Sequence, residues 1–171
     1  MPDAVHDADS AQASEEQRNF YELLGRAVAR WAFVEEGIYH VYRRITGPMD
    51  WPAAAAGFHA IADPNTRLDI VSAAMAASLA NVAHIDEWTG LRGKIRKNAI
   101  RRVKLATWTI AHGLDARQQC PVTCLVAPVH GIAEKGANGE REKIHAEHIA
   151  EWTVGFGELA NDLDRFWRKV S

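Results

Sequence analysis

Apolar residues recur every three or four positions along two long stretches of the chain. The first stretch alternates between the two spacings without a miss, at Phe20, Leu24, Ala27, Trp31, Val34, Ile38, Val41 and Ile45. This is heptad spacing, which predicts a long helix with one continuous buried seam. The second stretch repeats the pattern at Ile149, Trp152, Phe156, Leu159, Leu163, Phe166 and Val170. We expect it to form the last helix and to pack on the first.

Capping residues and prolines predict where the helices begin and end. Ser14 and Gln17 form a capping-box pattern at the start of the first helix, and Gly47-Pro48 is typical of its end. The residues before it, 1–14, are small and acidic, so we expect a disordered tail. Three further helices are predicted over 52–62, 64–83 and about 86–112, the first two because a capping aspartate lies ahead of a proline in the first helical turn.

The stretch over 113–145 differs from the rest of the chain because it is rich in proline, glycine and turn residues. Its segment 122–127 is rich in β-branched residues, which predicts a strand within a small β-hairpin or ordered loop. The remaining pattern predicts an all-α fold, an up-and-down bundle of four main helices plus a short one. We expect residues 15–171 to form a single domain.

Length and charge narrow the classes of function. The chain has 171 residues and a formal net charge of -2, so its surface as a whole is not built for a polyanion, and any such binding requires a local patch. Two cysteines are too few for a disulfide framework, and no secretion signal or membrane-spanning run is visible. We therefore expect a cytoplasmic protein without a membrane partner.

A cationic stripe is the clearest candidate for a binding surface. Between Glu87 and Asp115 the sequence has no acidic residue. On a helical wheel one arc carries Lys94, Lys97, Arg101, Lys104, Trp108 and His112. Such a stripe could follow a phosphate backbone, with the Trp108 ring stacking on an unpaired base. A solvated helix face with one half-buried tryptophan is the alternative.

Arg102 falls on the opposite side of the same wheel, in the apolar arc with Leu91, Ile95 and Ala106. A buried guanidinium needs a carboxylate partner. Glu35 flanks the seam of the first helix, so we expect a structural ion pair between Arg102 and Glu35.

The segment Ile110-Ala111-His112-Gly113, between a long seam helix and a hydrophobic last helix, resembles the HEPN superfamily of helical bundles (higher eukaryotes and prokaryotes nucleotide-binding). In that superfamily a helix ends in an alanine-histidine-glycine step, and an early helix carries a glutamate near Glu35. The resemblance implies a homodimer. It also implies a metal-independent ribonuclease activity in the active members, which use an arginine separated from the histidine by four to six intervening residues.

The chain departs from the superfamily pattern at the arginine. His112 matches the family histidine, but the arginine positions are occupied by Leu105, Ala106 and Thr107. Lys104 lies just outside that window, about 80° around an unbroken helix from His112. A ribonuclease needs a base near the 2′-hydroxyl and a cation for the charge on phosphorus, so we expect an inactive relative.

The sequence predicts no metal site and no cofactor. A single Glu142-x-x-His145 motif is followed by His148, whereas di-iron bundles need two such motifs and further glutamates. Glu36 and His40 share a helix face, but it points away from the seam and is expected to be solvated.

Three functions remain open. The preferred hypothesis is a non-catalytic HEPN-like binding or interaction module, a homodimer, whose basic helix face contacts RNA or another polyanion. The first alternative is a ribonuclease using His112, with Lys104 or Arg101 replacing the missing arginine. The second is a structural or protein-partner bundle in which the basic face meets an acidic protein.

Overall fold

The computed structural model describes residues 3–47, 51–78, 82–114, 120–128 and 141–170. In these residues the chain is a predominantly helical bundle with a small antiparallel sheet before the last helix, which confirms the predicted fold class. The chain divides into two compact units. Unit 1 comprises Met1–Ala29 and Arg101–Thr153, and unit 2 comprises Arg30–Ile100 and Val154–Ser171. Within the described ranges, no helix combines the length and apolar composition needed to cross a bilayer.

The first helix, α1 (Asp3–Thr46), carries the predicted seam. All of its seam residues are buried except Leu24, which is half-buried. The helix starts at Asp3, eleven positions before the start that the capping pattern predicted at Ser14. Residues 3–13 contain alanines and neither glycine nor proline, so an established helix propagates through them at little cost. Gly47 follows the helix with a φ of 71°, the left-handed conformation that ends helices.

Unit 2 also contains α2 (Trp51–Ala60), α3 (Pro64–Ser78) and most of α4 (Val82–Thr107). The predicted end of the third helix at 83 is wrong, because α3 ends at Ser78 and Val82 begins α4 with an exposed side chain. Asp63 caps α3 by accepting hydrogen bonds from the Thr66 and Asn65 amides, as its position before Pro64 predicted.

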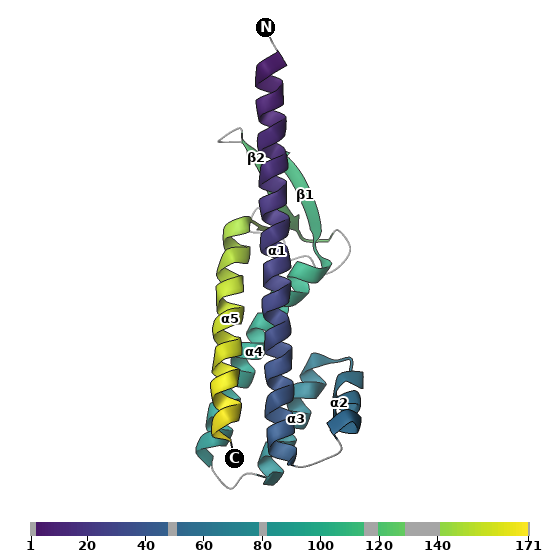
Figure 1. Cartoon of the computed structure of the whole chain (residues 1–171), viewed down its shortest axis with the longest axis vertical. Helices are drawn as coiled ribbons and strands as arrows, with labels where there is room; N and C mark the ends of the chain where they lie inside the picture. The colour runs from purple at the N-terminus through teal and green to yellow at the C-terminus, as the bar shows by residue number, and fades with distance from the viewer. Residues whose placement is uncertain (1–2, 48–50, 79–81, 115–119, 129–140, 171) are drawn as a thin grey trace. The chain divides into compact units, whose positions relative to one another are not determined.

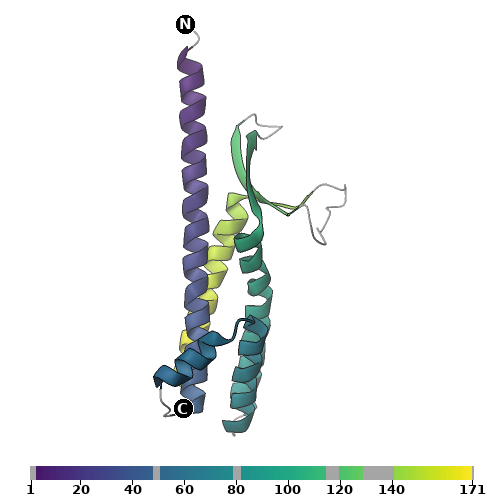
Figure 2. The same ribbon diagram turned by 90° about the vertical axis from the view of Figure 1, so that its right-hand side faces the viewer.

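The second half of the last helix, α5 (Ala146–Lys169), lies beside the second half of α1 in both ribbon views (Figures 1 and 2). Every seam residue predicted for the last helix is buried. Trp31 meets Phe156 edge-on with ring centroids 5.2 Å apart. Gly37 allows a close approach, because a Cβ there would lie 2.9 Å from Cβ of Leu163. The predicted packing of the last helix on the first is therefore present within unit 2.

Unit 1 holds the sheet, whose order is β1-β2-β3. The strands are β1 (Thr109–Leu114), β2 (Pro121–Val126) and β3 (Lys143–Ile144), and β1 pairs antiparallel with β2 beside α1 (Figure 1). The predicted strand over 122–127 is confirmed, but the predicted helix over 86–112 is wrong at its end. The residues Thr107-Trp108-Thr109-Ile110 favour an extended chain, and pairing with β2 stabilises it. His112 thus lies in a strand.

Candidate functional site

The predicted cationic stripe begins on α4, but its members differ in exposure. Lys94 and Lys97 are exposed, whereas Arg101, Lys104 and Trp108 are half-buried. His112 lies beyond the helix in β1, so it does not share the stripe, and its angular relation to Lys104 on an unbroken helix does not exist. The six residues therefore do not form one continuous cationic surface.

In unit 2, Lys94 is held by an acid from another helix. Its Nζ donates to Oδ2 of Asp162 on α5 at 2.9 Å, and Arg165 donates to the other oxygen at 2.5 Å. Partial burial tends to raise the pKa of Asp162, but the hydrogen bonds from Lys94 and Arg165 outweigh it and hold the pKa below its ordinary value of 3.8. Lys94 therefore neutralises a carboxylate at the surface of the bundle.

In unit 1, Lys104 and Arg101 are also held by acids. Lys104 Nζ donates to both carboxylate oxygens of Glu142, at 2.8 and 2.9 Å, and lies 4.9 Å from the centroid of the Trp108 ring. Arg101 lies 3.8 Å from a Glu151 oxygen and 5.6 Å from the Trp152 ring. The sequence shows no acid within this stretch of helix, but α5 and the residue before β3 bring acids from elsewhere in the chain.

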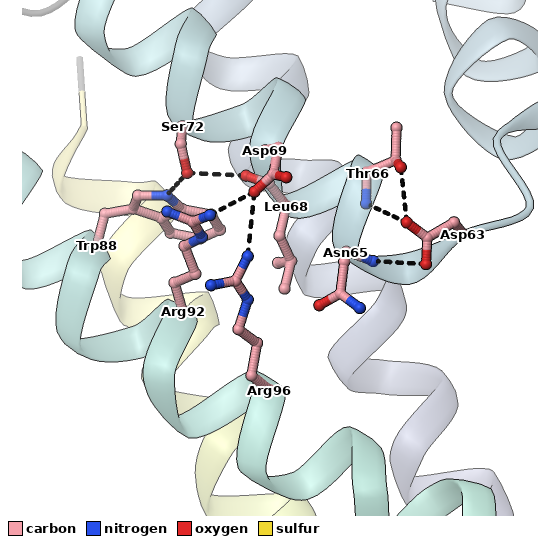
Figure 3. Close-up of polar contacts among 9 residues, drawn as sticks. All are labelled: Asp63, Asn65, Thr66, Leu68, Asp69, Ser72, Trp88, Arg92 and Arg96. Carbon is pink, nitrogen blue, oxygen red and sulfur yellow. Dashed lines mark hydrogen bonds and ion pairs between the residues drawn. The ribbon is translucent and has the colours of Figure 1, made fainter.

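Two further cations of α4 share one carboxylate in unit 2 (Figure 3). Arg92 and Arg96 both bind Oδ1 of Asp69 on α3, the latter at 3.2 Å. Beside them Trp88 donates from Nε1 to the Ser72 hydroxyl at 2.9 Å. That hydroxyl donates in turn to the backbone carbonyl of Leu68 at 2.8 Å. These cations join α3 to α4.

Lys97 and Arg102 are different, because both are exposed and neither has an ion pair in the described part of the chain. For Arg102 this corrects the prediction that it faces the core. With Arg102 exposed, there is no buried charge to neutralise, so the reason for an ion pair with Glu35 is gone. Glu35 instead accepts a hydrogen bond from Nε1 of Trp31 at 2.9 Å. Ala106, predicted to be buried, is exposed, and Leu105 is buried in its place.

An apolar side chain lies exposed on α4 next to Lys97. Ile100 is 63% exposed. It follows Lys97 by three residues within unit 2, so the two side chains share one side of the helix. We call Lys97 and Ile100 the α4 contact face. The sequence pattern did not point to Ile100, because the helical wheel was centred on the cations.

His112 is anchored by a chain of hydrogen bonds within unit 1. The antiparallel register places it directly opposite Thr123 on β2, and its Nδ1 lies 3.1 Å from the threonine hydroxyl. That hydroxyl donates to Oε2 of Glu16 on α1, and the Thr123 amide donates to Oε1 of the same carboxylate at 2.9 Å. Among the described polar and charged side chains, Thr123 is the one that is buried, with 1% exposed.

The direction of these hydrogen bonds determines the state of the imidazole. The Thr123 hydroxyl donates its one hydrogen bond to Glu16. Its oxygen can therefore only accept a hydrogen bond from His112. Neutral His112 must then carry its proton on Nδ1, which leaves the Nε2 lone pair available. His112 is exposed, and the Tyr21 ring lies 6.4 Å from it between centroids. Glu16, Thr123 and Tyr21 could not be predicted as its neighbours, because they join it only through the strand register.

The structure shows no metal cluster within the described residues, in which no three of the histidine, cysteine, aspartate and glutamate side chains converge. Glu142, from the single Glu-x-x-His motif, is bound by Lys104. The backbone N–H of His145 donates a hydrogen bond to Nδ1 of His148 at the start of α5. Glu36 and His40 share a face as predicted, 3.5 Å apart.

Searches against protein-family models, curated proteins and solved structures found no match to this chain.

Proposed function

We propose that this chain is a non-catalytic helical interaction module that binds an acidic protein segment through the α4 contact face. One observation carries the proposal: Ile100 is exposed beside Lys97, which has no ion pair among the described residues. A polyanion such as RNA needs free cations but no aliphatic side chains. An acidic amphipathic segment uses both.

The ion pairs of α4 support the same choice. Lys94, Arg101 and Lys104 already neutralise acids of α5 and the β3 region, so they offer little free charge to a phosphate backbone. RNA binding by the predicted stripe is therefore the weaker hypothesis. The resemblance to the HEPN superfamily stays a prediction.

The test uses two labelled helical peptides with the same glutamate content, one with leucines on a single face and one with serines in their place. Fluorescence anisotropy should show saturable binding of the leucine peptide and much weaker binding of the serine peptide. Ile100→Ser and Lys97→Ala should each weaken binding by roughly threefold to tenfold, since each removes on the order of 1 kcal/mol of contact.

Two variants serve as matched controls. Val82→Ser alters an exposed valine at the start of α4, and Lys94→Ala removes a cation that is already paired. Both should leave peptide binding within about twofold of wild type. Binding of single-stranded RNA without peptide binding would overturn the proposal and restore the RNA hypothesis.

A second candidate function, a ribonuclease, is favoured by the hydrogen bonds that link Glu16 through Thr123 to His112. They hold the imidazole with Nε2 free, as a general base requires. The predicted substitute cation Lys104 is bound to Glu142, which argues against charge stabilisation at phosphorus. Cleavage of a single-stranded RNA pool that is lost in His112→Ala would establish this activity. Cleavage unaffected by the substitution would assign it to a contaminant.

A further inference from the structure

A hollow of about 320 Å³ lies between α1 and α5 within unit 2. Its size is at the lower end of the range for small-molecule sites. Its lining includes Arg30, Phe33, Glu36 and His40 of α1 and Asn161 and Asp164 of α5. Small residues from both helices make the space. At Gly157 an added Cβ would meet its nearest atom, Cδ of Arg30, at 4.0 Å.

One side of the hollow offers an unused cation and amide. Arg30 is exposed and forms no ion pair with any residue that the structure describes, unlike Arg92, Arg96 and Arg101 of α4. Asn161 on α5 is also exposed, and its side-chain amide has no hydrogen bond in the same described ranges. A guanidinium and an amide together are suited to a carboxylate.

Carboxylates also line the hollow. Glu36 lies 3.5 Å from His40, measured from Oε1 to Nε2. Asp164 accepts hydrogen bonds from Trp167 Nε1 at 3.0 Å and from Arg168 Nε at 2.9 Å. The bonds from Arg168, above all, keep the pKa of Asp164 below its ordinary value although desolvation opposes them, so this carboxylate stays ionised. The hollow therefore presents both signs of charge.

Aromatic rings complete the lining. Phe33 is 54% exposed, a large apolar area left open to water at the edge of the hollow. The His40 and Trp167 rings stack with centroids 5.5 Å apart. An occupant with an apolar group would cover the Phe33 ring, which the protein alone leaves in water.

We propose that this hollow binds a small zwitterion with an apolar side group, in the class of free aromatic amino acids. Arg30 and Asn161 hold the carboxylate, Glu36 attracts the ammonium group, and the side group packs against Phe33. The site is distinct from the α4 contact face, and neither proposal depends on the other.

The experiment titrates L-phenylalanine into the full chain and follows the indole N–H resonance of Trp167, which a Trp167→Phe spectrum assigns. The parallel titrations use phenylpropionate, which lacks the ammonium group, and phenethylamine, which lacks the carboxylate. Saturable binding of phenylalanine, at least tenfold tighter than either analogue, is the expected result. Equal binding of all three, or no saturable shift, would overturn the proposal.

Variants locate the two charged ends of the ligand. Arg30→Gln should weaken phenylalanine binding at least tenfold and leave phenethylamine binding unchanged, because only the carboxylate contact is lost. Arg26→Gln, an exposed arginine of α1 that pairs with Glu22, is the matched control and should change neither. Gly157→Leu should fill the space and abolish binding. Full affinity in Arg30→Gln would overturn the assignment, and that substitution, at an exposed position, does not disturb the core.

Discussion

At the scale of single residues, Thr123 connects several parts of unit 1 through its hydrogen bonds. It is buried, and its amide and hydroxyl both donate hydrogen bonds to Glu16. Its hydroxyl oxygen accepts a hydrogen bond from the His112 ring. These bonds fix a side chain of the first helix and an exposed imidazole to one position in the sheet. The hydroxyl is therefore both a structural group and the support of His112.

Thr123→Val should lower the free energy of unfolding by about 1–3 kcal/mol, because the shape is kept while the Glu16 carboxylate loses a donor near the protein interior. Urea denaturation measures the change. Thr123→Ser keeps the hydroxyl and should cost about 1 kcal/mol or less. Nitrogen chemical shifts of His112 give a second test, since the Nδ1-H form should dominate in wild type and decline in the valine variant. Equal stability of the valine and serine variants would contradict the role of the hydroxyl.

Asp162 provides a pH-dependent contribution to stability. Its pKa is lowered in the folded chain, so its contribution is fully present above the ordinary value of 3.8 and is lost as the pH falls through the lowered pKa. Asp162→Asn should cost about 0.5–1 kcal/mol at neutral pH, since the pairs with Lys94 and Arg165 lie at the surface. Denaturation from pH 7 to about pH 2 should show the two proteins converging in acid.

Asp86→Asn is the control for this profile, because Asp86 is exposed and has no ion pair in the described ranges. The free energy of unfolding of this variant should match that of wild type at every pH. A constant difference between Asp162→Asn and wild type, down to the lowest pH, would show that the effect is not electrostatic.

At the scale of elements, periodic apolar patterns predicted which residues of a helix are buried, because local sequence controls this. The seams of α1 and α5 were predictable residue by residue, because burial on a helix follows its turn. The end of α4 was not, since β1 forms only when β2, fourteen residues after the helix ends (121 − 107), lies beside it. The candidate site was hidden for the same reason. Glu142, Asp162 and Asp69 are far from α4 in sequence and neutralise its cations only in the fold.

The contact between α1 and α5 in unit 2 makes Gly37 sensitive to substitution. Gly37→Ala should destabilise the chain by about 1–3 kcal/mol, because the new methyl overlaps Leu163. The steric cost of this overlap exceeds the gain in helix propensity. Gly25→Ala, in the same helix with no atom within 4 Å, should stabilise by about 0.5–1 kcal/mol. Thermal unfolding of both variants measures the contrast. Stabilisation by both would mean that α1 and α5 approach less closely than described.

At the scale of the whole molecule, the balance of charges shows why composition says little about ligands. The chain has 20 basic and 22 acidic residues, and many of them meet across elements that are distant in sequence. A cluster of cations in the sequence is thus distributed among structural ion pairs. What is left for a ligand is a small number of side chains, such as Lys97 and Arg30.

The homodimer implied by the resemblance is a prediction for this scale. No tryptophan whose side chain is described is exposed, so these rings do not mark a surface for a second copy. Trp51 lies outside the side chains described. Sedimentation equilibrium over a range of concentrations should give twice the mass of 18.9 kDa if the dimer forms. A single species of 18.9 kDa at every concentration would remove the dimer.

The pairing of β2 with β3 has a practical consequence for how this chain tolerates change in length. The Ala127 amide donates to the Glu142 carbonyl at 3.2 Å, and Val126 stands opposite Lys143, so the ends of the intervening segment are already held together. Doubling the length of a loop between fixed ends costs only about 0.6 kcal/mol in closure entropy. A reporter peptide inserted between these paired ends should therefore lower the free energy of unfolding only slightly.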